Sequence, residues 1–284
     1  MTENANPLNK YFRQASIYVS LPSGTNYPTS VVTPSETGEL GIMPMTAKDE
    51  IRFKTPDALM NGQGVVDVIE SCVPNIKDAW QIKSYDLDTV LVAIRVATYG
   101  ETMEINFTVP GAKETVAHTV NLPAMLDEIS KAKIQSEFTL KDGLKIAVQP
   151  LTYRDMTSTS LQTFQQQKMY TAIQDSQLSD SDKAQRFNDA FAKLTELNSS
   201  ILLKNIASIT TTDGTVITDA NHIKEFVENA NATVIKEIED KLTALRAQGA
   251  VKPLKMKATE DQIKKGAPAS YEVPVTFDTS NFFV

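Results

Sequence analysis

Cysteine and histidine are nearly absent from this 284-residue sequence. Cys72 is the one cysteine, and His118 and His222 are the two histidines. A single cysteine excludes an intramolecular disulfide framework and a cysteine-based zinc cluster. Cys72 follows an apolar helical pattern, which favours a small buried side chain over a nucleophile. Neither histidine has a nearby Glu-x-x-His partner, so we interpret both as structural.

The sequence also lacks an excess of positive charge and any long apolar run. Lysine and arginine total 28 and aspartate and glutamate total 35, so the net charge is −7. A strongly basic nucleic-acid binder is therefore excluded, because phosphate neutralisation needs a cationic surface. The most apolar segment, Val90–Ala97, is interrupted by Arg95 and is shorter than the roughly 18 residues of a membrane helix. The N-terminus shows no signal-peptide pattern, so we expect a soluble protein of a reducing compartment, without membrane insertion.

No motif for catalysis or cofactor binding stands out. Gly62 and Gly64 form a lone glycine pair, without the third glycine and the preceding strand of a phosphate-binding loop. Asp86 and Asp88 lie at an expected helix start, where the helix dipole favours carboxylates. We therefore predict no enzymatic activity, no cofactor and no metal.

Residues 1–50 are rich in proline, serine and threonine, and five of the 13 prolines fall there. Proline excludes a long helix, so we predict an extended N-terminal arm with a short strand over Ser16–Leu21. Apolar residues scattered between Thr25 and Met45 indicate that the arm packs on something. A flexible leader is the alternative.

The rest of the chain predicts an α+β fold with a mainly helical body. Apolar residues at helical spacing favour a helix capped by Ser84 or Asp86, another from Ser160, and one long helix that is capped by Thr218 or Asp219 and ends at Gly249. We expect helices mainly in two segments of the chain. These are residues 51–100 and 151–249.

Alternating apolar residues and turn residues predict β-hairpin inserts in this helical body. One hairpin-rich insert spans residues 101–150, and a further hairpin lies near residues 206–218. Residues 250–284 predict an edge strand over Tyr271–Phe277, followed by an aromatic tail that we expect to dock into a pocket. The expected division of the chain is therefore 1–50, 51–100, 101–150, 151–249 and 250–284.

A family resemblance is carried by five segments. These are Ile51–Gly62, Val68–Trp80, Asp86–Glu101, Leu144–Tyr153 and Val275–Phe283. They resemble the baseplate protein family of T4-type contractile-tailed bacteriophages, whose members are hub subunits or factors needed to assemble the hub. The resemblance spans about residues 48–283, is most specific over 51–101 and leaves the N-terminal arm uncovered.

The sequence departs from that family at one point. Some relatives carry a Cys-x-x-Cys pair where this chain has Val109–Ala112, and another pair near the C-terminal strand, as in a zinc ribbon. Neither region contains a cysteine here. The resemblance therefore implies a degenerate zinc-ribbon-like hairpin without zinc, held by strand pairing and packing alone.

The resemblance and the extended arm predict a structural subunit of the baseplate hub that acts through protein–protein contacts. A tail or hub assembly chaperone that leaves the virion is the alternative, and a tail-associated cell-wall hydrolase is a remote one. Expected partners are other phage tail and baseplate proteins, with tape-measure or hub subunits as further candidates, in the virion and in the host cytoplasm during assembly. The candidate partner contacts are Tyr18, Tyr27, Val31, Ile42, Tyr271, Phe277, Phe282 and Phe283.

Overall fold

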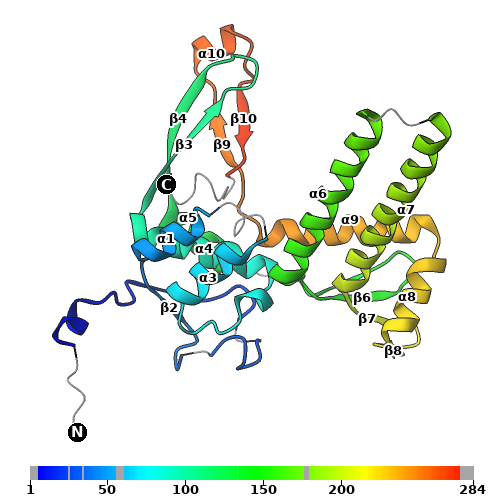
Figure 1. The fold of residues 1–284 in the computed structure, drawn as a ribbon, viewed down its shortest axis with the longest axis horizontal. Coiled ribbons are helices and arrows are strands. Elements are labelled where there is room, and N and C mark those ends of the chain that lie inside the picture. The colour runs from blue at the N-terminus through cyan, green and yellow to red at the C-terminus, as the bar shows by residue number, and fades with distance from the viewer. Residues whose placement is uncertain are drawn as a thin grey trace.

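The structure is a computed structural model that describes residues 6–24, 26–33, 35–55, 61–132, 134–175 and 179–275. It confirms an α+β fold in which helices are joined by small antiparallel sheets. Figure 1 shows a central helical body, a pair of β-hairpins that rises from it, and a helical lobe beside it. We call these parts the central body, the double hairpin and the helical lobe.

The central body buries the larger of two hydrophobic clusters formed by the described residues. Helix α4 runs through this cluster, and every residue of its stretch Val90–Ile94 is buried. A helix enclosed on several sides needs such a continuous apolar stretch in place of a single stripe. The elements of the central body are β1 (Ile17–Val19), β2 (Leu40–Ile42), α1 (Ala47–Phe53), α3 (Gln63–Cys72), η2 (Ala79–Gln81), α4 (Ser84–Tyr99) and α5 (Leu122–Ser130).

The described residues between 17 and 45 belong to the central body, so an extended arm over residues 1–50 is not confirmed. Strands β1 and β2 pair antiparallel, with Tyr18 opposite Gly41. The scattered apolar residues did signal packing, but they pack on the chain's own helices. A shorter segment that contains η1 (Pro7–Tyr11) extends away from the body (Figure 1). The buried apolar residues of 17–45 are Val19, Leu21, Val31, Val32, Leu40, Ile42 and Met45.

The double hairpin joins segments that are far apart in the sequence. Strands β3 (Thr102–Thr108) and β4 (Thr115–Asn121) form the predicted hairpin. Strands β9 (Leu254–Lys257) and β10 (Ser270–Val273) form a second one, with α10 (Glu260–Lys264) in the connection. The rings of Phe107 and Tyr271 lie 6.1 Å apart, and Lys265 pairs with Glu114 at 3.1 Å. A zinc-ribbon-like character of these hairpins is not confirmed.

The helical lobe encloses the second hydrophobic cluster. Its sheet has the order β5-β6-β7-β8, so the two hairpins predicted from the sequence are joined by pairing of β6 with β7. Residues on both sides of position 150 therefore share one sheet, and the division into five segments stays a prediction. The elements are β5 (Glu137–Thr139), β6 (Lys145–Val148), α6 (Tyr153–Asp175), α7 (Asp180–Asn205), β7 (Ile206–Thr210), β8 (Val216–Ile217), α8 (Ala220–Asn229) and α9 (Ala232–Gly249).

Two helix predictions in the lobe are wrong in their boundaries. The expected long helix from Asp219 is divided into α8 and α9, because the Asn231 side chain accepts a hydrogen bond from the Thr233 N–H at 3.0 Å and caps a new helix. Helix α6 begins before Ser160. The Thr152 hydroxyl accepts from the Asp155 N–H at 3.2 Å while the Asp155 carboxylate accepts from the Thr152 N–H at 3.3 Å, which forms a capping box.

Candidate protein–protein interface

The titratable residues of the described chain show no metal-binding group. No three of their His, Cys, Asp and Glu side chains are arranged to hold a metal ion. No helix in the described part is both long and apolar enough to cross a membrane. His118 lies in β4 opposite Ile105, and His222 lies in the first turn of α8. Burial raises the pKa of the Cys72 thiol to about 11, which opposes formation of a nucleophilic thiolate.

The N-terminal segment, residues 6–13, exposes three large apolar side chains. Leu8 is 59% exposed, Tyr11 is 74% exposed and Phe12 is 58% exposed. Leu8 and Tyr11 belong to η1, which begins where the Asn6 side chain accepts a hydrogen bond from the Leu8 N–H at 3.0 Å. No residue of η1 is buried. Apolar side chains gathered on one exposed segment are typical of an interaction site.

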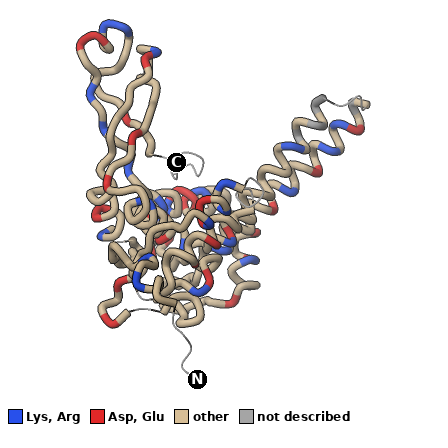
Figure 2. The backbone as a smooth tube through the Cα atoms, turned by 60° about the vertical axis from the view of Figure 1, so that its left-hand side comes forward, with Lys and Arg blue, Asp and Glu red and all other residues tan. Residues whose placement is uncertain are grey.

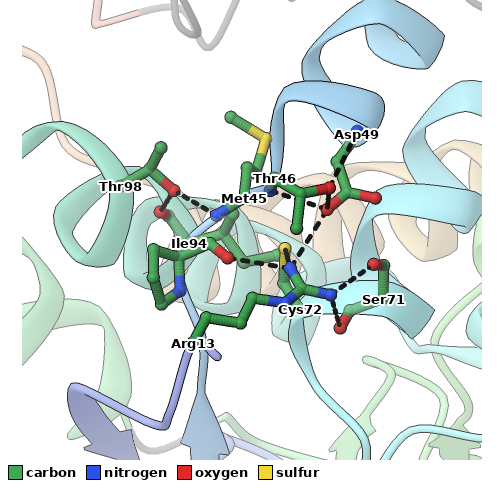
Figure 3. Close-up of polar contacts among 9 residues, drawn as sticks. Arg13, Met45, Thr46, Asp49, Ser71, Cys72, Ile94 and Thr98 are labelled. Carbon is green, nitrogen blue, oxygen red and sulfur yellow. Dashed lines mark hydrogen bonds and ion pairs between the residues drawn. The ribbon is translucent and has the colours of Figure 1, made fainter. Parts of the chain in front are cut away.

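Arg13 fastens this segment to the central body (Figure 3). Its Nη1 donates to the Pro44 carbonyl at 2.8 Å and to Asp49 Oδ2 at 3.0 Å, and its Nη2 donates to the Ser71 carbonyl at 2.8 Å. Asp49 also closes a capping box with Thr46 at the start of α1. Burial acts to raise the pKa of Asp49, but the Thr46 hydrogen bonds and the Arg13 charge outweigh it and keep the pKa below its usual value.

A second anchor holds Ser23 and Tyr27 against the start of α4. The buried Asp86 carboxylate accepts hydrogen bonds from the Ser23 N–H at 2.9 Å, from the Ser23 hydroxyl and from the Tyr27 hydroxyl at 2.6 Å. Burial raises the pKa values of Asp86 and Tyr27. Neither Asp86 nor Ser84 caps α4 as predicted, since the N-cap is Lys83, which has no side-chain bond. Asp86 binds the N-terminal part of the chain instead.

Helices α6 and α7 form a helical hairpin that projects from the rest of the molecule in both views (Figures 1 and 2). Ile173 and Ala190 are buried between the two helices. Phe191, the residue after Ala190, is 73% exposed. Two isolated helices cannot enclose large side chains on all sides, so the outer faces of this hairpin stay open. The exposed apolar residues are Leu161, Phe164, Met169 and Phe191.

A cavity of about 240 Å³ lies where the central body meets the helical lobe. We call it the junction pocket. Met156, Leu242 and Leu245 supply apolar walls, and Asp88 of α4 supplies a carboxylate. Within the described part of the chain, Asp88 has no hydrogen bond or ion pair. Burial raises the pKa of Asp88 to about 6.

A larger cavity of about 690 Å³ lies between α5, β4 and the start of β9. Val120 and Met125 line it together with charged residues. The Glu128 carboxylate and the Lys252 ammonium, both in its lining, form an ion pair with each other. Two of the charged groups in this larger cavity are therefore already paired, whereas the Asp88 carboxylate in the junction pocket is not.

Four of the predicted partner contacts lie in residues 17–45. Tyr18 is 64% exposed on β1 and is available to a partner. Tyr27 is half-buried and bonded to Asp86. Val31 and Ile42 are buried in the central cluster, so their apolar surface is already covered by this chain. The structure therefore brings Val31 and Ile42 together in one core, with Tyr27 packed against it.

The other predicted contacts belong to the C-terminal part. Tyr271 is half-buried on β10 against Phe107. Beyond the described residues lie Phe277, Phe282 and Phe283, together with the expected docking of the aromatic tail. As contacts with another protein, these and the four earlier residues stay predictions.

Sequence reasoning placed residues 6–13 in the N-terminal arm but did not single out Leu8, Tyr11 or Phe12, and it missed both anchors. A signal for the segment was present, because residues 6–16 combine aromatic and basic residues and contain no acid. The bonds of Arg13 to Asp49 and Ser71 have no such signal, since the partners are 36 and 58 positions away. The lack of a hydrogen-bond or ion-pair partner for Asp88 has no sequence signal either, because it depends on packing between helices that are distant in the chain.

Comparison with known proteins places most of the chain in one family. The model of the family described as T4 bacteriophage base plate protein matches residues 24–264. No curated protein and no solved structure matches the chain. The matched residues include the central helices, the β3–β4 hairpin and the whole helical lobe. The chain therefore belongs to the T4 bacteriophage base plate protein family.

Proposed function

We propose that this chain is a structural subunit in the hub region of a contractile phage tail baseplate. Family membership implies a structural role in the baseplate, in the virion, with other tail and baseplate proteins as partners. It also suggests a role without enzymatic activity. Hub location and retention in the virion are the finer parts of the proposal.

One observation carries the proposal beyond the family. Large apolar side chains are exposed on elements that project from the central body, above all Phe191 on α7 and Tyr11 in η1. Figure 1 shows η1 and the α6–α7 hairpin on opposite sides of that body. Surfaces of this kind let one subunit contact several neighbours at once, and burying them on assembly is favourable.

A tail or hub assembly chaperone is the second candidate. The same exposed surfaces would hold a partner before assembly, and a net charge of −7 keeps a free protein soluble. The tail-associated hydrolase stays a remote candidate, and release of peptidoglycan fragments by the purified chain would support it.

Quantitative mass spectrometry of purified phage particles and of tail intermediates tests the structural role. We expect this chain in mature particles at a fixed ratio to other baseplate proteins. Its presence in intermediates and absence from mature particles would overturn the structural role in favour of the chaperone.

A pair of variants connects this role to the exposed surface. Phe191→Asp places a charge on the exposed large apolar side chain of α7, and Ala192→Asp places the same charge on the adjacent exposed position. We expect Phe191→Asp to be folded but poorly incorporated into tails, and Ala192→Asp to be incorporated normally. Equal incorporation of both variants would remove the α6–α7 hairpin from the interface.

A further inference from the structure

We infer that the N-terminal segment of one copy of this chain docks into the junction pocket of a second copy, with Lys10 paired to Asp88. The aromatic rings beside Lys10 would pack against the apolar walls of the pocket. This inference rests on the proposed structural role, because it names one partner of that role.

Charge distinguishes the N-terminal segment from the rest of the chain. Residues 1–16 contain Lys10, Arg13 and Glu3, which sum to +1, so residues 17–284 carry −7 − 1 = −8. Residues 6–16 contain both cations and no acid. A cationic segment on an acidic chain is attracted to another copy of the same chain, which favours encounter and orientation.

The segment presents its cation and its aromatic surface together. The Lys10 ammonium lies 5.0 Å from the centre of the Tyr11 ring, and the Phe12 ring follows directly. Arg13 fixes the base of the segment through its bonds to Asp49 and the Ser71 carbonyl. Fixing one end lowers the entropy lost when the rest of the segment becomes ordered on a partner.

The junction pocket is complementary to such a segment. Its volume of about 240 Å³ lies below the ~300–1,000 Å³ of small-molecule sites, so it suits one or two inserted side chains. Leu242 and Leu245 form apolar walls, and Asp88 has no charged partner among the described residues. The exposed Arg246 also lines the pocket but forms no ion pair with Asp88. An incoming ammonium would supply the missing counter-charge.

The donor segment and the acceptor pocket face different sides of one molecule. In Figure 1 the dark blue segment that contains η1 extends from the side of the central body opposite α6 and α9, which line the pocket. A segment attached to the body by Arg13 on that side docks into another copy more readily than into its own. The resulting contact is heterologous, and its repetition produces a closed ring or an open chain.

Sedimentation velocity of the full chain over a range of concentrations tests this contact. We expect concentration-dependent self-association that weakens as salt increases. Lys10→Glu and Asp88→Lys should each weaken association at least about tenfold, and the two together should restore it to within a few-fold of the original protein. Lys48→Glu and Asp240→Lys, at exposed positions of α1 and α9, are the matched controls and should leave association unchanged.

Asp88→Asn is a second variant for the pocket in case Asp88→Lys does not fold, and it should weaken association in the same direction. A monomeric original protein at ~100 µM in low salt, or a charge-exchanged pair that fails to recover association, would overturn the inference. A monomeric chain that is present in mature particles would overturn this contact alone. An associating chain that is absent from particles would overturn the structural role alone.

Discussion

Burial has opposite consequences for two charged side chains of α4. Asp86 is fully buried and accepts hydrogen bonds from Ser23 and Tyr27. Arg95 is 7% exposed, and its Nε and Nη1 atoms are buried without a hydrogen-bond partner. The Arg95 guanidinium lies 4.4 Å from the centre of the Tyr99 ring, and burial lowers the pKa of Arg95. A cation–π contact offsets only part of the cost of desolvating a charge.

Arg95→Met should therefore raise the free energy of unfolding, by about 1 kcal/mol, because an apolar chain of similar length needs no counter-charge. Urea denaturation of the purified variant measures the change. The matched control is Arg154→Met, which removes an exposed arginine 5.2 Å from the Trp80 ring and should change stability by less than about 0.5 kcal/mol. A less stable Arg95→Met variant would show that the guanidinium contributes a favourable interaction.

The raised pKa of Asp88 predicts that the free energy of unfolding depends on pH, because ionised Asp88 in the junction pocket destabilises the folded chain. The folded pKa of about 6 exceeds the ordinary value of 3.8, so the unfolded chain loses this proton first as pH rises. Stability due to Asp88 is present below about pH 4 and is lost between about pH 4 and 6. Asp88→Asn removes this loss. The variant should match the original protein near pH 4 and exceed its stability by at most about 3 kcal/mol at pH 7.

Urea denaturation at a series of pH values, at dilute protein concentration, gives this difference directly. Asp240→Asn on the exposed face of α9 is the matched control for loss of a carboxylate. A stability difference for Asp88→Asn that does not vary with pH would mean that the Asp88 carboxylate is ordinarily solvated.

At the scale of elements, the sequence predicted those hairpins whose strands and turn are close together in the chain. Alternating apolar residues in the insert over residues 101–150 predicted hairpins such as β3–β4, and the hairpin predicted near residues 206–218 is β7–β8. The β9–β10 hairpin and its packing on β3–β4 had no comparable signal, because they depend on segments about 150 residues apart. The division at Asn231 was missed because the apolar stripe continues on both sides of it.

The tips of the two hairpins meet at a pair of glycines, which gives a prediction at this scale. Gly111 has φ +81°, and a β-carbon there would lie 2.2 Å from the Gly266 carbonyl oxygen. Gly111→Ala should lower the free energy of unfolding of the double hairpin by about 2–4 kcal/mol, from backbone strain plus the clash. Gly214→Ala, with φ +88° and nothing within 4 Å, should show the strain alone, about 1–2 kcal/mol.

Hydrogen exchange of the β9–β10 amides separates the two causes. Gly111→Ala should speed exchange in β10 as well as in β3, whereas Gly214→Ala should affect β7 and β8 only. Equal stability losses, with no change in β10, would show that the tips do not depend on each other.

At the scale of the whole molecule, the sequence predicted the class of fold and the family. It predicted less well which residues are buried and which are exposed on the surface. Proline-rich composition excludes a long helix, but it does not exclude core packing, so residues 17–45 were assigned to an arm although they fill a core. Apolar residues such as Val31 and Ile42 became candidate contacts for the same reason. Exposure of Leu8 and Tyr11 follows from where the chain leaves the body, and the acid-free composition of residues 6–16 signals the segment but not the exposure of each side chain.

Two truncations test this division of the N-terminal region. Removing residues 1–12 deletes the exposed segment but keeps Arg13, and none of its described residues is buried. We expect stability within about 0.5 kcal/mol of the original protein, with loss of self-association and poorer incorporation into tails. Removing residues 1–45 deletes seven buried apolar side chains and both residues that bond Asp86.

The second truncation should not fold. Seven buried side chains at about 1.5–3 kcal/mol each contribute on the order of 10–20 kcal/mol, which exceeds the whole stability of ~5–15 kcal/mol of an ordinary domain. Near-ultraviolet circular dichroism and thermal denaturation of both truncated chains provide the measurement. A cooperative transition in the 46–284 chain would restore the arm as an element separate from the core. Unfolding of the 13–284 chain would mean that residues 1–12 are held by the body and are not free to reach a neighbour.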